Sequence, residues 1–531
     1  MKRNHHFKFT GILLFGLSVL FLTSCSQGSD NLAAIPKETN FVSVINLYSL
    51  AQKGKLGEIS DRNFFQSLKN ELQSESKKLA KLVDNIMEAP AITGIDVKAD
   101  IFGYYVVEER SKQYACLSAK LNSEDKFGNF IKELLSELEI DFNIEKGKNY
   151  KYILADGEFA ITWDTKKALV LIPLSPDGRR SMEAEIEILM TLKSKDQITN
   201  NDDFNKFYEN KKDISFWVSS NILEDYILEE LLRTTGVDYS NSYFRAYFNF
   251  EKGKVSLLTQ FIPNEELKLK MKEYSGNTIP FNDNLFQYLP ETSYAAMSVT
   301  LDPMAFYNAL SKESGFDDMD MAALFKEGLG MDMKEFFESF KGSILFSLFD
   351  FRNVEMGYSS EMLPVMGLIF DINSSQIIKS VIKKAGILDL SVTKQDSYYQ
   401  LTMDELTVYI AFSEKECLLT NDKNAAEAFQ NSGFGKESLG KNPIRASMTK
   451  NTVYGYWNLN FDEYPEIVKE KIGNNFGGSI LKLWNSFARN LEFRSVDEIS
   501  SEFILNLQDD TNNSLYSIIN FTDNVYKEIM H

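Results

Sequence analysis

The chain has 531 residues, of which 44% are hydrophobic and 13% aromatic, and its net charge is −19. A chain this rich in apolar side chains can form real cores, so a largely disordered protein is excluded, and the length predicts two to four domains. The acidic balance argues against nucleic acids and anionic lipid headgroups as partners, because both require clustered Lys and Arg.

The N-terminal segment predicts export. The basic stretch MKRNHHFKFT precedes the apolar run GILLFGLSVLFLT, and the small residues Ser24 and Cys25 follow. This order is typical of a secretory signal peptide, here over residues 1–24, and the apolar run is too short for the roughly 20 residues of a transmembrane helix. Removal of this segment, which holds three basic and no acidic residues, leaves a net charge of −22.

The end of that segment also suggests a lipid anchor. Leu22-Thr23-Ser24-Cys25 resembles the lipobox of bacterial lipoproteins, which implies that Cys25 becomes the first mature residue and carries acyl chains that anchor it firmly. In such lipoproteins an acidic residue directly after the Cys favours the inner membrane. Ser26 stands there instead, so the resemblance implies the outer membrane, with the periplasmic and cell-surface faces both open. Residues 25–34 are predicted to be a polar tether.

Histidine is missing from the body of the chain, because His5, His6 and His531 all lie near its ends. This excludes Ser-His-Asp and Cys-His catalysis and nearly all catalytic zinc sites. Carboxylate-pair catalysis, as in glycoside hydrolysis, needs no His, but no spacing among the 76 Asp and Glu residues singles out a pair. We therefore expect no enzyme activity and keep a carboxylate-dependent hydrolase as an alternative.

Other local motifs do not meet the requirements of a cofactor site. SGFGKESLGK at 432–441 lacks the P-loop spacing and has Glu437 where that loop needs Ser or Thr, so we expect a loop and no nucleotide. The acidic stretches at 200–205 and 317–321 lack EF-hand spacing and are interpreted as solvated helix starts. Methionines at 319–321 and 331–333 have no nearby His or Cys for copper, so we expect packing. No metal or cofactor is predicted.

The opening IPKETNFVSVINLYSL at 35–50 returns as LPETSYAAMSVTLDPMAF at 289–306. In both halves a hairpin follows, and then a helix with N-cap residues at Asn122-Ser123 and Asn373-Ser374. Internal repeats of this kind indicate a duplicated structural unit. The sequence predicts a first repeat unit over 35–275, a linker over 276–288 and a second repeat unit over 289–531.

Each half continues with a meander, in which Asp156-Gly157 and Asp404-Glu405 occupy matching turns. The alignment puts Cys116 opposite Gly367 and Cys417 opposite Ala168, as expected of small buried residues, although a disulfide stays open in an oxidising compartment. Each half is predicted to end in a hairpin and a helix. The hairpin turns are expected at Lys252-Gly253 and at Asp509 to Asn513.

Two aromatic pairs, Phe216-Trp217 and Tyr456-Trp457, fall on each other at an offset of 240 residues. Exposed, they could stack on glycans or anchor a protein partner; buried, they are duplicated core. Adjacent strand residues face opposite ways, so at most one residue of each pair can be core if the outer face of the sheet is wet. We favour the core interpretation, and we keep Trp217 and Trp457 as candidate ligand or partner contacts.

The predicted fold class is α+β, a tandem duplication of a unit of antiparallel sheet, with hairpins and a meander, packed by amphipathic helices. An exported lipoprotein of this length that opens with an Ile-Pro-Lys-x-Thr strand resembles an uncharacterised outer-membrane lipoprotein family of Bacteroidota. The resemblance implies an outer-membrane address and carries no catalytic residues.

The leading functional hypothesis is a lipid-anchored, non-enzymatic binding or scaffold subunit of an envelope protein complex. It would contact the outer membrane through acyl chains on Cys25 and other envelope proteins through its body. The alternative of another class is a glycan-binding or apolar-ligand-binding protein with its site between the two halves.

Overall fold

The computed structural model describes residues 30–109, 112–155, 157–223, 227, 238–312, 326, 330–356, 359–387, 391–395, 397–403 and 406–530. The chain forms two compact units. The first unit comprises Met1–Ile222, Tyr243–Thr259 and Asp509–His531, and the second comprises Leu223–Ser242 and Gln260–Gln508. In the described part of the chain, no helix is long and apolar enough to cross a membrane.

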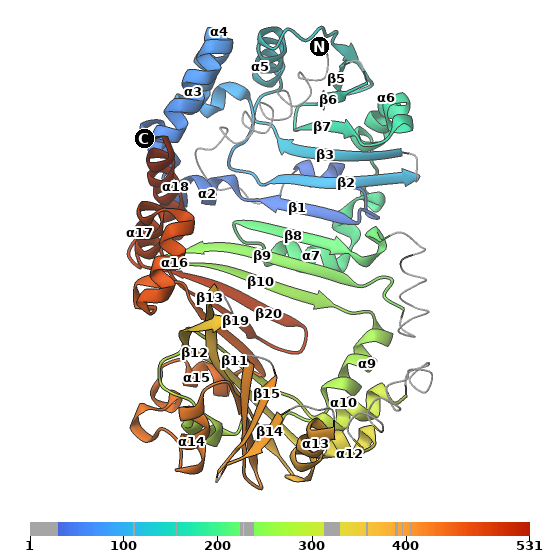
Figure 1. Ribbon diagram of the computed structural model, residues 1–531. Helices are drawn as coiled ribbons and strands as arrows, with labels where there is room; N and C mark the ends of the chain where they lie inside the picture. Colours follow the sequence, from blue (N-terminus) through green and yellow to red (C-terminus); the bar gives the residue numbers. More distant parts are fainter. Residues whose placement is uncertain are drawn as a thin grey trace. The chain divides into compact units, whose positions relative to one another are not determined.

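The first unit is built on an antiparallel sheet with the strand order β4-β5-β6-β7-β3-β2-β1-β8-β9. Figure 1 shows β3, β2, β1, β8 and β9 side by side. The strand bounds are β1 (Phe41–Ile45), β2 (Ile101–Glu109), β3 (Lys112–Lys120), β4 (Glu145–Lys146), β5 (Lys151–Ala155), β6 (Phe159–Trp163), β7 (Lys167–Pro173), β8 (Ile214–Ser219) and β9 (Tyr243–Glu251). Strand β10 (Lys254–Ile262) forms a hairpin with β9 around Gly253, whose positive φ suits a tight turn.

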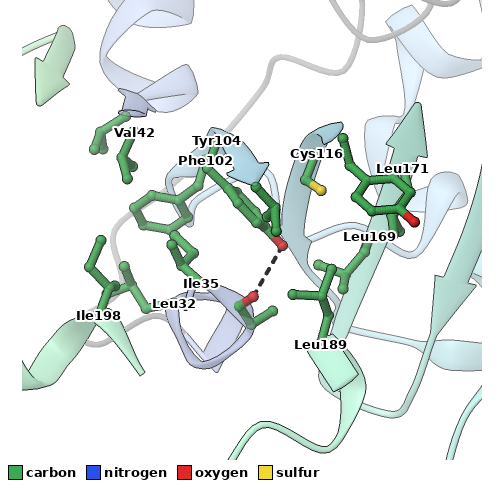
Figure 2. Packing of buried hydrophobic residues seen from close by; sticks show 14 of the residues in the cluster. Leu32, Ile35, Val42, Phe102, Tyr104, Cys116, Leu169, Leu171, Leu189 and Ile198 are labelled. Carbon is green, nitrogen blue, oxygen red and sulfur yellow. Dashed lines mark hydrogen bonds between the residues drawn. The ribbon is translucent and has the colours of Figure 1, made fainter. Parts of the chain in front are cut away.

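Helices cover the sheet of the first unit where its strands are buried. Their bounds are α2 (Leu47–Gly54), α3 (Asn63–Glu75), α4 (Lys77–Glu88), α5 (Glu124–Glu137), α6 (Pro176–Met190), α7 (Asp202–Glu209) and α18 (Ser514–Met530). All five residues of β6 are buried, because one hydrophobic cluster packs on each of its faces. Figure 2 shows part of the cluster around β2 and β3, where the Tyr104 hydroxyl donates to the carbonyl of Ala34 at 3.1 Å.

The second unit repeats this arrangement with the order β14-β15-β16-β17-β13-β12-β11-β18-β19-β20, again all antiparallel. The strand bounds are β11 (Ala295–Thr300), β12 (Phe340–Met356), β13 (Ser359–Ile372), β14 (Ser391–Lys394), β15 (Tyr399–Met403), β16 (Leu406–Phe412), β17 (Glu416–Thr420), β18 (Val453–Asn458), β19 (Ala488–Ser495) and β20 (Ser500–Leu507). The helix bounds are α9 (Glu265–Ser275), α10 (Pro303–Leu310), α12 (Met333–Glu338), α13 (Gln376–Ile387), α14 (Lys423–Gln430), α15 (Arg445–Lys450), α16 (Glu466–Phe476) and α17 (Gly478–Phe487).

The strand order of the first unit, read from β4 to β9, matches the strand order of the second unit, read from β14 to β19. This match confirms the predicted α+β fold with a tandem duplication. The repeated opening has equivalent partners as well: Pro36 bridges Gln197, and Pro290 bridges Ser438. The predicted cap Ser123 accepts a hydrogen bond from the backbone N–H of Lys126 at the start of α5. In the second half the Ser374 hydroxyl accepts one from Gln376 at the start of α13.

The compact units differ from the predicted boundaries at several places. Residues 30–34, predicted as tether, form a 3₁₀ helix in which Asn31 donates to the carbonyls of Asp100 and Ser118. Within the predicted linker, Leu285 and Phe286 are buried in the second unit. The last helix of each repeat also lies in the other compact unit, because α9 belongs to the second unit and α18 to the first.

The predicted hairpin turn at Asp509 to Asn513 is wrong. The final hairpin consists of β19 and β20, and the chain after Asn513 forms helix α18. The Asn513 side chain accepts from the backbone N–H of Leu515, and its carbonyl accepts from Ser517, so this residue starts a helix. Of the turns predicted in the meanders, Asp156, Asp404 and Glu405 lie outside the described residues.

Candidate functional site

The predicted site residues have different outcomes. Cys25 lies outside the described residues. Trp217 on β8 is 1% exposed and packs edge-on against Phe204 in the core of the first unit. Trp457 on β18 is 54% exposed, whereas its neighbour Tyr456 packs against the core of the second unit, so the core residue of this pair is the tyrosine. A contact role stays a prediction for Trp457, whereas the Trp217 ring offers no surface to a partner.

The difference between the two tryptophans follows from strand register. Trp217 pairs with Val42 on β1, and the equivalent pair on β11 and β18 is Ala296 with Tyr456. Trp217 is therefore equivalent to Tyr456, at an offset of 239, and the predicted offset of 240 is wrong by one residue. A shift of one residue moves a side chain to the opposite face of a sheet, which is why Trp457 points outward.

Trp457 belongs to an apolar surface on β11, β18, β19 and β20. In the register of these strands, Ala295, Trp457, Leu491 and Leu505 lie in one row across the sheet, and Met297, Gly455, Phe493 and Phe503 lie in the next. Residues two apart on a strand share a face, so both rows point the same way. We call these eight residues the apolar face.

The apolar face is the uncovered part of a sheet surface that helices cover elsewhere. Over β13, β16 and β17 the same surface packs under α13 in a hydrophobic cluster. On the apolar face Met297 is 44% exposed and Phe503 is 40% exposed, and Leu491 is also exposed. None of the eight side chains carries a charge, in a chain whose net charge is −19. Contiguous exposed apolar surfaces of this kind typically mark interaction sites.

Tyr464 lies near Trp457 at the edge of the apolar face. Burial raises the pKa of Tyr464 to about 12, so this phenol stays protonated. The Tyr464 hydroxyl donates to the carbonyl of Asn458 at 2.7 Å, and its ring stacks on Tyr294 with centroids 4.3 Å apart. Tyr464 is thus fixed at this edge by a hydrogen bond and a ring contact within the chain.

The opposite surface of the same strands combines buried core residues such as Tyr454 and Ile504 with paired polar groups. The Arg494 Nε donates to Glu502 at 2.8 Å, the Tyr454 hydroxyl donates to Glu492 at 3.1 Å, and Asn506 donates to Glu492 at 2.8 Å. Burial, and then the nearby Glu492, raises the pKa of Tyr454 well above its usual range. These charged and hydrogen-bonding groups of β18, β19 and β20 thus have partners within the chain, on the side away from the apolar face.

Both cysteines of the body are buried free thiols. The strand register confirms that Cys116 is equivalent to Gly367 and Cys417 to Ala168. Burial raises the pKa of the Cys417 thiol to about 12, and burial followed by the charge of Glu185 raises that of Cys116. Thiols with raised pKa values are poor nucleophiles at neutral pH, so both residues have the properties of packing residues.

The remaining motifs have structural roles where they are described. In the glycine-rich loop the Glu437 carbonyl accepts from the backbone N–H of Glu291, next to the repeated opening of the second half. Asn201 in the acidic stretch 200–205 is the N-cap of α7. The acidic stretch at 317–321 and the methionines at 319 and 321 lie outside the described residues, and Met331 is buried beside α13.

Three comparisons with known proteins give one broad match. A family model described as a domain of unknown function, DUF4836, matches residues 31–515. The comparison with curated proteins finds no match. Among solved structures, crystal form IV of TP0453 is 12% identical and covers 44% of this chain and 81% of its own, with a TM-score of 0.24. Crystal form I of TP0453 is 10% identical and covers 45% and 80%, with a TM-score of 0.25.

Proposed function

We propose a function for this chain, which belongs to the DUF4836 family of unknown function: it is a lipid-anchored, non-enzymatic protein of the outer membrane that binds another protein in an envelope complex. Complexes for outer-membrane protein assembly or nutrient uptake are examples of such assemblies. The observation that carries this proposal is the exposed apolar face of the second unit.

The anchor rests on the sequence. The signal-like segment 1–24 ends at Cys25 in a lipobox-like tetrapeptide, and the residue after it is Ser26. Substitution of Cys25 by Ala is expected to move the protein from the membrane fraction to the soluble fraction. Membrane association that persists in Cys25→Ala would contradict the lipid anchor and leave the binding proposal to its own test.

The binding role rests on the apolar face. Interface cores are enriched in aromatic residues and Met and depleted of charge, and Trp is among the commonest residues whose truncation costs much binding energy. Trp457, Met297 and Phe503 combine these properties on one surface.

Purification from native membranes in mild detergent tests the binding role. The full-length chain is expected to carry a stoichiometric protein partner, and Trp457→Glu is expected to lose it, because a charge would then be buried in the contact. Leu269→Glu is the matched control, since Leu269 is 67% exposed on α9 and lies outside the apolar face. A wild-type protein that purifies without any partner, or a Trp457→Glu variant that keeps it, would overturn the proposal.

A further inference from the structure

The two units differ most on the surface that contains the apolar face. In the first unit the equivalent surface is filled by a diagonal of aromatic rings: Phe216 lies between Phe41 and Phe248, with ring centroids 6.2 Å apart in each case. The three side chains come from β8, β1 and β9. The first unit thus covers the centre of its own sheet surface with its own phenylalanines.

The second unit has small residues at these three positions. The strand registers make Ala295 equivalent to Phe41, Gly455 to Phe216 and Ser495 to Phe248. A Cβ atom built on Gly455 would contact only Phe493, at 3.8 Å from its Cβ, which is an ordinary van der Waals distance. The backbone at Gly455 therefore has room above it where the first unit has a phenyl ring.

Bulky apolar side chains surround this space. Trp457 replaces Val218, Met297 replaces Ser43 and Phe493 replaces Ala246 at equivalent positions. Trp457 and Met297 are about half exposed, so their sides are available to a group seated over Gly455. Aromatic groups prefer such offset or edge contacts with other rings, at centroid distances of about 4.5–7 Å.

We propose that the apolar face binds an uncharged aromatic side chain of its partner, seated over Gly455 between Met297, Trp457 and Phe493. The inference rests on the proposed function and specifies its contact group. Phe216 in the first unit is an internal example of the group that fills this position. The net charge of −19 disfavours an anionic occupant and a second copy of this chain, because the negative field of the chain would repel both. The uncharged face itself favours an uncharged occupant.

A neutral aromatic probe, N-phenyl-1-naphthylamine, tests the site in the full-length protein. We expect saturable binding to the wild type and to the control Gly455→Ala, and binding weaker by about tenfold or more in Gly455→Phe, because the new ring would occupy the site as Phe216 does. Energy transfer from tryptophan to the bound probe should fall in Trp457→Phe, while directly excited probe fluorescence persists. Unchanged thermal unfolding of Gly455→Phe is the check that it folds.

Probe binding to Gly455→Phe as tight as to the wild type, or no saturable binding to the wild type, would overturn the aromatic site. The probe assay needs no partner, so either result would leave the co-purification experiment as the separate test of the proposed function. Conversely, a chain that binds the probe at Gly455 but purifies without a protein partner would retain the site and lose the proposed function.

Discussion

Trp217 and Trp457 are chemically identical side chains in opposite environments. Trp217 stacks on Tyr243 at 5.1 Å and meets Phe204 edge-on at 5.8 Å, so its ring is part of the packing of the first unit. Trp457 has solvent over about half of its surface. Burial of a large aromatic side chain stabilises a fold, whereas an exposed one contributes little.

This difference predicts the stability of two alanine variants. Trp217→Ala should lower the free energy of unfolding by about 3–5 kcal/mol, because it leaves a cavity in the core. Trp457→Ala should lower it by at most about 1 kcal/mol, as is usual for surface substitutions. Urea unfolding followed by circular dichroism measures both. Equal losses in the two variants would contradict the register that separates Trp217 from Trp457.

At the scale of single elements, helix α18 supplies the N-terminal cap that helix α3 lacks. Arg62, at the N-cap of α3, makes no side-chain cap hydrogen bond. Asp523 of α18 takes this role: it accepts from the backbone N–H of Phe64 at 3.2 Å and from the Asn63 side chain at 2.9 Å. Tyr516 of the same helix lies under the Lys55 ammonium at 4.0 Å. The C-terminal helix is thus fixed to the first unit by polar as well as apolar contacts.

The Asp523 cap predicts a stability effect that depends on pH. Burial opposes ionisation of Asp523, but the hydrogen bonds from Asn63 and Phe64, together with the Lys527 ammonium at 3.3 Å, outweigh it and lower its pKa. A lowered pKa adds stability above the unfolded value of about 3.9, and this stability is lost as the pH falls through the folded value. Asp523→Ala should therefore cost about 0.5–2 kcal/mol at pH 7 and progressively less below about pH 4.

Urea unfolding of wild type and Asp523→Ala at several pH values checks this expectation. Asp523→Asn is the matched control, because it keeps an acceptor oxygen and removes the charge. A difference between wild type and Asp523→Ala that stays constant from neutral pH to well below pH 4 would show that the carboxylate does not supply the cap.

The same helix explains one limit of prediction from sequence. The segment SLYSIINF combines β-branched and aromatic residues that suit a strand with apolar positions at Leu515, Ile518 and Ile519 that suit a helix. Its conformation is decided by surfaces contributed from the start of the chain, such as Gly54 on α2, where a Cβ atom would lie only 3.0 Å from Ile519. Contacts this distant in sequence are not visible in a local pattern.

Other features could be predicted because they depend on local chemistry. The helix start at Ser123 follows from one cap, and the turn at Gly253 follows from one hairpin. The equivalence of Cys116 with Gly367 follows from matching hairpins in the two halves. The apolar face could not be predicted, since the doublets Phe216-Trp217 and Tyr456-Trp457 suggested a register that is wrong by one residue. Only the pairing of Ala296 with Tyr456 shows which side of β18 faces solvent.

At the scale of the whole molecule, the sequence repeats and the compact units are different divisions of the chain. Helix α18 ends the second repeat but packs on α2 and α3 in the first unit, and α9 ends the first repeat but packs on α10 in the second. In the second unit Tyr274 of α9 meets Phe306 of α10 with ring centroids 5.9 Å apart. Each compact unit therefore needs a segment from the other repeat to complete its packing.

This exchange predicts that the first unit depends on the last residues of the chain. Deletion of residues 509–531 removes the Asp523 cap of α3 and the side chains of Leu515 and Ile519 that lie within about 3.3 Å of the Gly54 Cβ position. Amide hydrogen exchange over residues 47–75 should become faster, because local protection reflects local packing. Strands β12, β13 and β17, which make no contact with the deleted residues through their ladder, should keep their protection.

Deletion of residues 530 and 531 alone is the control, since Met530 is 65% exposed and contributes little packing. Hydrogen exchange followed by mass spectrometry resolves both regions in one experiment. Unchanged exchange over residues 47–75 in the longer deletion would contradict the dependence of the first unit on α18. Loss of protection across β12 and β13 to the same extent would instead mean that the two units unfold as one cooperative body, because separate units lose protection separately.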